Sequence, residues 1–166
     1  MSGTTPGGVL FVCLGNICRS PLARAVLQHK ASRRGVDHLL EVDSCGTGGW
    51  HAGDGADPRS VAVAARYGVE LRHVARRFDP RSDPRRFGFI IAMDRSNIAN
   101  LERAGLPPGR ASLLRAFDPA LAGAGPAGLE VPDPYYGGDD GFERVYAMID
   151  TACDGLLDHV LRATRA

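Results

Sequence analysis

Residues 9–26 read VLFVCLGNICRSPLARAV and join a buried strand to a helix through a short loop. The run 9–13 is continuously apolar and rich in β-forming residues, which is typical of a strand covered on both faces of a parallel sheet. Pro21 stands where a helix can begin, because proline fits the first helical turn, and apolar residues follow it at helical spacing. The stretch therefore predicts the first strand, loop and helix of an α/β fold.

Strand and helix signals alternate along the rest of the chain. We expect strands over 39–44, 87–93 and 111–114, helices over 58–67, 96–104 and 142–162, and a loop rich in Gly and Pro over 118–141. This alternation predicts a flavodoxin-like fold, a doubly wound four-stranded parallel sheet with helices on both faces. Ligands of such sheets bind at the carboxyl ends of the strands, so the loops that follow the strands are the candidate sites.

The composition is that of an ordinary globular domain. The chain has 166 residues, 44% of them hydrophobic, so we expect a single domain over 1–166 with a flexible stretch at 1–7. The 20 basic and 19 acidic residues nearly cancel, which argues against nucleic acid or a membrane surface as the partner. The apolar run near the start is too short for a signal peptide or a membrane span, so we expect a cytoplasmic protein.

The loop after the first strand carries the strongest functional signal. Cys13 is followed after five residues by Arg19 and then by Ser20, at the junction of strand and helix. Loop N–H groups and a helix N-terminus suit an anion of phosphate size, and the Arg19 guanidinium can hold two phosphoryl oxygens. The same positive surroundings favour the thiolate form of Cys13, Gly15 lets the backbone turn, and the Ser20 hydroxyl can donate to sulfur. We therefore predict a phosphate-binding loop with Cys13 as its nucleophile.

Other interpretations of this loop compete with that prediction. Cys13 could instead be a buried cysteine at a strand end. Cys18 and Arg24 repeat the spacing, yet the residues between them include Pro21 and should already be helical. A nucleotide-binding Walker loop needs Lys before Ser or Thr, and the only lysine, Lys30, lies on the following helix. No pair of Cys or His residues has good metal spacing, so we expect neither metal nor cofactor.

A general acid is needed for an oxygen that leaves phosphorus. The chain has five Asp-Pro dipeptides, so the dipeptide alone selects none of them. Asp133 stands apart because Tyr135 and Tyr136 follow it, and two aromatic rings can line a slot for a flat substrate. Asp57 fits a helix start instead. Trp50, the only tryptophan, sits among glycines, where an exposed aromatic wall is favoured over core packing.

Two motifs resemble the low-molecular-weight protein tyrosine phosphatase family, VCLGNICRSPLA at 12–23 and DPYYG at 133–137. The resemblance runs from Val9 to about Val160 and includes shorter stretches at 44–51, 73–76 and 92–97. It implies hydrolysis of phosphotyrosine in proteins, and of small aryl phosphates, through a phosphocysteine intermediate. The implied enzyme is a monomer that uses no metal or cofactor and takes phosphotyrosine proteins as substrates.

The resemblance also implies a role for each residue of the site. Cys13 would be the nucleophile, Arg19 would bind the phosphoryl oxygens and Asp133 would be the general acid. The rest of the phosphate loop and its supports would be Leu14, Gly15, a strained Asn16, Ile17, Cys18, Ser20, Ser44 and His73. The substrate rim would be Trp50, Tyr135 and Tyr136. Cys18 would form a reversible, protective disulfide with the nucleophile, and a tyrosine kinase would act on Tyr135 or Tyr136.

Two other functions remain open at this point. A thiol-dependent arsenate reductase of the same fold would need two further cysteines to relay a disulfide, and only Cys45 and Cys153 are available. A phosphotyrosine-binding module without turnover should lack the nucleophile or the acid, whereas this chain keeps Cys13, Arg19 and Asp133. Cys45 also departs from the family pattern, which commonly has a small residue such as alanine there, and we expect little effect from it.

Overall fold

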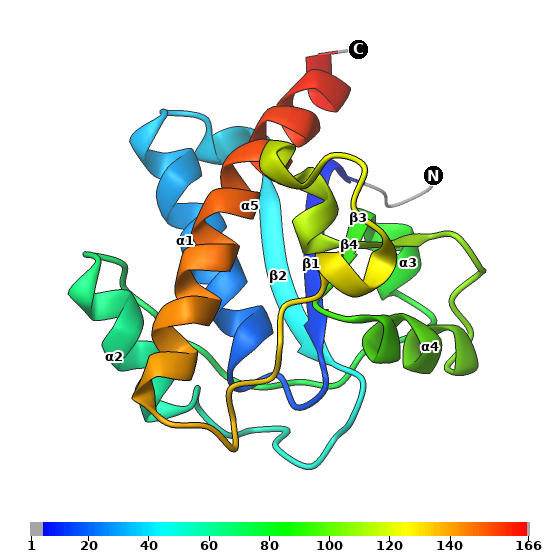
Figure 1. Ribbon diagram of the computed structural model, residues 1–166. Helices are drawn as coiled ribbons and strands as arrows, with labels where there is room; N and C mark the ends of the chain where they lie inside the picture. Colours follow the sequence, from blue (N-terminus) through cyan, green and yellow to red (C-terminus); the bar gives the residue numbers. More distant parts are fainter. Residues whose placement is uncertain (1–4, 166) are drawn as a thin grey trace.

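A four-stranded parallel sheet forms the centre of the molecule, with strand order β2-β1-β3-β4 (Figure 1). The computed structural model describes residues 5–165. Its strands are β1 (Thr5–Cys13), β2 (Glu41–Gly46), β3 (Phe87–Ala92) and β4 (Ala111–Leu113). Each neighbouring pair is parallel, which confirms the predicted doubly wound α/β fold.

Helices cover both faces of this sheet, as predicted. The α-helices are α1 (Arg19–Arg33), α2 (Pro58–Arg66), α3 (Asp83–Arg86), α4 (Arg95–Arg103) and α5 (Asp139–Arg165). Short 3₁₀ helices occupy Asp37–Leu39 (η1), Leu114–Phe117 (η2), Pro119–Leu121 (η3) and Pro126–Leu129 (η4). Helices α1, α2 and α5 lie on one face, and α3 and α4 lie on the other (Figure 1). In the described part of the chain, no helix combines the length and apolarity that a membrane crossing requires.

Strand β1 is buried on both sides because its side chains alternate between two cores. Val9 and Phe11 belong to the larger core, under α1 and α5, while Leu10 and Val12 belong to the smaller one, under α4. All four side chains are fully buried. This double burial is the reason that the sequence shows a continuous apolar run here instead of an alternating one.

Strand β1 begins earlier than the sequence pattern predicts. It starts at Thr5, which pairs with Phe87 of β3, so residues 5–7 belong to a strand and are not the flexible stretch that we expected. The rest of that stretch, residues 1–4, lies outside the described residues. The apolar pattern missed this extension because Thr5, Pro6 and two glycines precede Val9.

Helices α1 and α5 differ from their predicted bounds by more than one residue. Helix α1 begins at Arg19, because Pro21 lies in the first turn, where its missing N–H is not needed. Helix α5 runs from Asp139 to Arg165, beyond both ends of the predicted 142–162. The predicted loop 118–141 contains the short helices η3 and η4, since a single 3₁₀ turn requires no sustained apolar period.

The topology places the loop after β1 at the edge of the sheet where ligands bind. The chain passes from β1 to β2 on one side and then returns to β3 on the other side of β1. The connections therefore diverge beside β1, which is the usual binding position in an open α/β sheet. In Figure 1 the loops after β1 and β2 lie at the lower end, together with the segment that leads into α5.

Candidate active site

The loop between β1 and α1 encloses the thiol of Cys13. Cys13 ends β1 and is only 3% exposed, and its Sγ lies 2.9 Å from the Oγ of Ser20. Ser20 is fully buried in the first turn of α1. A hydroxyl at this distance can donate a hydrogen bond to the sulfur of Cys13.

The N-terminus of α1 is open, in contrast to those of two other helices. Its N-cap residue, Cys18, makes no side-chain cap, whereas Asp57 caps α2 and Asp94 caps α4. An N-terminus without a cap keeps N–H donors and the positive end of the helix dipole available to the loop. This arrangement suits a phosphate-sized anion and supports the predicted phosphate-binding loop.

Asn16 has a left-handed backbone, and both the nitrogen and the oxygen of its side-chain amide are hydrogen-bonded. Its φ is 58°, the only positive φ at a non-glycine residue in the described part of the chain. Its Nδ2 donates to Ser20 Oγ at 2.8 Å and to Ser44 Oγ at 3.0 Å, and its Oδ1 accepts from the backbone N–H of Arg76 at 2.9 Å. Gly15, expected to allow the turn, is not at positive φ, so Asn16 makes the turn instead.

His73 supports the same residue from the outside of the loop. Its Nε2 lies 2.6 Å from the carbonyl oxygen of Asn16. Burial lowers the pKa of His73, so the neutral ring predominates at neutral pH. Because a carbonyl oxygen can only accept, Nε2 carries the proton and donates it. The expected supports, Ser44 and His73, therefore both contact Asn16.

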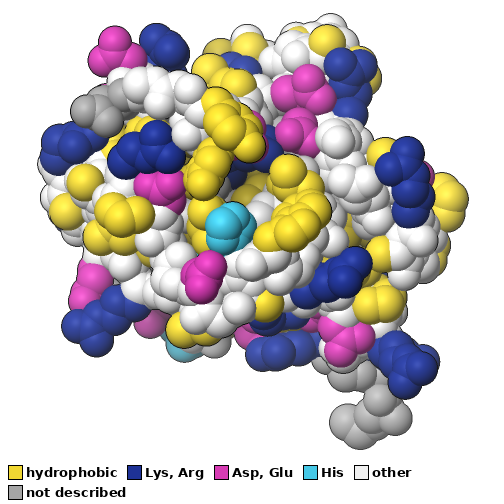
Figure 2. Space-filling view, turned by 90° about the horizontal axis from the view of Figure 1, so that it is seen from below, with side chains coloured by type: hydrophobic (Ala, Val, Ile, Leu, Met, Phe, Trp, Pro, Cys, Tyr) yellow, Lys and Arg dark blue, Asp and Glu magenta, His cyan; other side chains and the backbone are white. Residues whose placement is uncertain are grey.

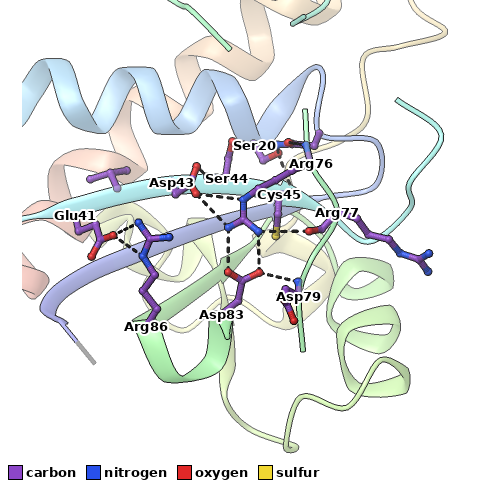
Figure 3. Close-up of polar contacts among 12 residues, drawn as sticks. Ser20, Glu41, Asp43, Ser44, Cys45, Arg76, Arg77, Asp79, Asp83 and Arg86 are labelled. Atoms are coloured by element: carbon purple, nitrogen blue, oxygen red, sulfur yellow. Dashed lines mark hydrogen bonds and ion pairs between the residues drawn. The ribbon is translucent and has the colours of Figure 1, made fainter. Parts of the chain in front are cut away.

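Arg76 anchors the segment that bears His73 (Figure 3). Its guanidinium makes a bidentate pair with the buried Asp83, with nitrogen–oxygen distances of 2.9 and 3.0 Å, and also contacts Asp43 at 3.1 Å. Its backbone N–H is the donor to Asn16. The phosphate loop is thus tied to β2 and α3 through one arginine, which we did not identify from the sequence because its partners are distant in the chain.

Arg19 is buried and held in one orientation at the floor of the loop. Its Nη1 donates to Asp94 Oδ2 at 2.7 Å and to the carbonyl oxygen of Val131 at 2.8 Å. Burial alone would lower the pKa of Arg19, but the charges of Cys13 and Asp94 outweigh it and raise the pKa. Asp94 was missed in the sequence, although its position two residues after the end of β3 was an available signal.

A pocket of about 300 Å³ opens over the thiol and collects most of the predicted site residues. Its lining consists of Cys13, Leu14, Gly15, Ile17, Cys18, Arg19, Trp50, His51, Asp133, Tyr135 and Tyr136. His51 is the one lining residue that the sequence did not single out. Figure 2 shows hydrophobic side chains gathered around a hollow at this end of the molecule. Asn16, Ser20, Ser44 and His73 are not among the lining residues and hold the loop in place.

Asp133 lies at the mouth of this pocket, with one oxygen facing Arg19. Its Oδ1 accepts from the backbone N–H of Tyr135 at 3.0 Å, and its Oδ2 lies 3.8 Å from Arg19 Nη2. The Asp133 side chain is 39% exposed, so water can reach it. Trp50 is 73% exposed and Tyr136 is 92% exposed, as expected for aromatic residues of a substrate rim.

Arg59 links the start of α2 to the loop that contains Asp133. Its Nη2 donates to the carbonyl oxygen of Tyr135 at 3.0 Å and to Asp57 Oδ2 at 2.9 Å. Its guanidinium also lies over the ring of Phe142, 4.6 Å from the centroid. This arginine was not predicted, because the sequence does not reveal that α2 and the start of α5 are neighbours.

The other thiols differ from Cys13 in their surroundings. Burial and the nearby Asp57 carboxylate raise the pKa of Cys18, which therefore stays protonated at neutral pH. Its Sγ lies 3.8 Å from Asp57 Oδ2. Cys45 and Cys153 are fully buried and belong to the two different cores, on opposite faces of the sheet. They cannot relay a disulfide to each other in this fold.

The stability of the protein should depend on pH through His73. Burial lowers the pKa of His73 in the folded state, so its contribution is complete above the ordinary value of 6.5 and is lost as the pH falls through the lowered folded value. We expect the free energy of unfolding, measured with urea from about pH 7 to about pH 5, to decline more steeply in the wild type than in His73→Gln. Equal slopes would contradict this assignment.

Replacing Arg76 should destabilise the fold much more than replacing its neighbour. Arg76→Gln leaves the buried Asp83 carboxylate without its cation, and we expect a loss of roughly 3 kcal/mol. Arg77→Gln, an exposed neighbour without an ion pair among the described residues, should change stability by less than about 0.5 kcal/mol. Urea denaturation of both variants measures the difference, and similar losses would show that the Asp83 pair is not important.

Comparisons with known proteins show the family to which the chain belongs. A family model described as low molecular weight phosphotyrosine protein phosphatase matches residues 8–166. A low molecular weight protein-tyrosine-phosphatase of Streptomyces coelicolor is 49% identical over 154 residues, covering 90% of each chain. A crystal structure of a protein tyrosine phosphatase from Entamoeba histolytica has a TM-score of 0.84 and 34% identity, over 93% of this chain and 97% of that one. The chain therefore belongs to the low molecular weight phosphotyrosine protein phosphatase family.

Proposed function

We propose that this protein hydrolyses phosphotyrosine in proteins, and small aryl phosphates, with Cys13 as the nucleophile. The observation that carries the proposal is the meeting of Cys13, Arg19 and Asp133 in one pocket with apolar and aromatic walls. A thiol, a guanidinium and a carboxyl group supply the three functions that the reaction requires: attack on phosphorus, charge stabilisation and protonation of the leaving oxygen.

In the first step the Cys13 thiolate attacks phosphorus. The Sγ–P bond forms as the bond from phosphorus to the tyrosine oxygen breaks, and Asp133 transfers its proton to that oxygen. The Arg19 guanidinium and the loop N–H groups hold the equatorial oxygens, where charge is concentrated. Because Asp94 and Val131 keep Arg19 in place, little reorganisation is needed when substrate binds.

In the second step water hydrolyses the phosphocysteine. Asp133, now ionised, accepts a proton from the attacking water, and its exposure to solvent gives that water access. The Sγ–P bond breaks, phosphate leaves and the thiolate is restored, with Ser20 donating a hydrogen bond to it. We expect turnover without added metal, because the guanidinium and the loop amides provide the positive charge.

The walls of the pocket favour an aromatic phosphate ester. Leu14, Ile17, Trp50 and Tyr135 present apolar surface above a deeply placed thiol, so a flat ring can reach down with its phosphate at the floor. We also propose that the enzyme is a cytoplasmic monomer whose Tyr135 or Tyr136 is a kinase target. The support for the latter is that Tyr136 projects into solvent.

The two rival functions find less support. A disulfide relay of the arsenate reductase type would need Cys45 and Cys153 to cooperate, and they lie in opposite cores. A binding module without turnover would not require a carboxyl group beside the guanidinium, whereas Asp133 stands 3.8 Å from Arg19. Reduction of arsenate in the presence of thioredoxin, without turnover of aryl phosphates, would favour the first of these rivals.

Removing the nucleophile should stop the reaction and leave binding intact. We expect Cys13→Ser to lose measurable turnover of p-nitrophenyl phosphate, since a hydroxyl is not ionised at neutral pH, while it still binds a phosphotyrosine peptide in calorimetry. Cys45→Ala, a change at a buried cysteine outside the pocket, is the matched control and should keep its activity. Substantial turnover by Cys13→Ser would exclude the phosphocysteine mechanism.

The effect of removing the acid should depend on the leaving group. We expect Asp133→Asn to lower kcat about 10²- to 10⁴-fold for a phosphotyrosine peptide. The loss should be smaller for p-nitrophenyl phosphate, because its phenoxide leaves without full protonation. Asp79→Asn, at another Asp-Pro dipeptide that is not in the pocket, is the control. If both substrates lost the same activity, Asp133 would not be the general acid.

A further inference from the structure

A second groove lies beside the active-site pocket, on the other side of Trp50. It has a volume of about 690 Å³ and shares two wall residues, Leu14 and Trp50, with the pocket over Cys13. Residues 47–49 form another part of its lining, and residues at the end of helix α4 complete it. A polypeptide that leaves the pocket past Trp50 therefore passes directly over this groove.

Two arginines line the groove without carboxylate partners. Arg77 extends along Gly49, whose Cβ, if present, would lie 3.4 Å from Arg77 Cδ. Arg103, on α4, donates to Asn100 Oδ1 at 2.9 Å. Neither arginine forms an ion pair with any side chain that the structure describes, and no described Asp or Glu lines the groove. The groove therefore carries two cations that no described carboxylate neutralises.

The arginines around the pocket over Cys13 differ from these two because they form ion pairs. Arg19, Arg59 and Arg76 each hold at least one carboxylate of this chain, so their charges are already compensated. In a chain with nearly balanced charges, an uncompensated pair beside the substrate opening is a local positive region. Such a region attracts carboxylates and repels cationic side chains of a substrate.

We propose that this groove binds an acidic side chain of the substrate, an Asp or Glu close in sequence to the phosphotyrosine. The proposal rests on the proposed function, because the phosphotyrosine must first occupy the neighbouring pocket. An extended peptide advances by about 3.3–3.6 Å per residue, and the two hollows adjoin each other, since Leu14 and Trp50 line both of them. A carboxylate one to three positions from the phosphotyrosine can therefore reach Arg77 and Arg103.

The size of the effect follows from the exposure of the two arginines. Ion pairs at exposed sites are individually weak, so we expect an acidic peptide to exceed its amide counterpart in kcat/KM by about threefold to tenfold at low salt, mainly through KM. The preference should shrink as salt is added, because exposed charges are screened.

The test compares matched phosphotyrosine peptides with Asp or Glu, or the corresponding Asn or Gln, at one to three positions on either side. Each pair is assayed with the wild type, Arg77→Gln, Arg103→Gln and the double variant, and p-nitrophenyl phosphate, which is too small to reach the groove, is the reference substrate. Arg162→Gln is the matched control, since Arg162 is an exposed arginine in the last turn of α5, at the opposite end of the molecule (Figure 1).

We expect the acidic preference in the wild type and in Arg162→Gln, a reduced preference in each single variant, and none in the double variant. Two outcomes would overturn the groove proposal and leave the proposed function standing. In one, the wild type turns over acidic and amide peptides equally; in the other, the double variant keeps the full preference. A protein that hydrolyses neither the peptides nor p-nitrophenyl phosphate would instead overturn the proposed function, and the groove proposal with it.

Discussion

The left-handed backbone at Asn16 is the constraint on which the phosphate loop depends. A non-glycine residue in this conformation costs about 1–2 kcal/mol, and it persists only where neighbouring groups hold it. Here Ser20, Ser44 and Arg76 contact the side-chain amide, and His73 contacts the carbonyl oxygen. These contacts come from α1, β2 and the segment before α3. The loop therefore keeps its shape only when both the sheet and its connections are complete.

The two arginines that support the loop, Arg19 and Arg76, are likewise held in place by groups distant in the chain. Arg19 is a buried cation whose position is set by Asp94 and Val131, and outside the loop Arg76 lies between Asp43 and Asp83. A buried charge is tolerable only when it is paired and hydrogen-bonded. At these two positions arginine is required in place of lysine, because a planar guanidinium can donate to several partners at once.

The fold and the centre of the site could be predicted because their signals are local. The apolar run of β1, the loop and the helix start are adjacent in the chain, and the spacing of Cys13 and Arg19 is set within that unit. Asp94 and Arg59 were missed because their roles depend on partners 75 and 76 residues away. The resemblance to the phosphatase family supplied Ser44 and His73, which local patterns alone would have left as a strand residue and a surface residue.

By itself, the sequence determined the strand–loop–helix unit, with Cys13 at the strand end and Arg19 at the helix start, because a connection of five residues has few ways to join a buried strand to a helix. Only the tertiary structure decided which distant groups complete the site. Five aspartates precede proline in this chain, and the crossover into α5 brings Asp133 to the carboxyl end of β1. The same crossovers place Arg77 and Arg103 in one groove. Long-range contacts of this kind arise from packing two cores against one sheet, which no local pattern records.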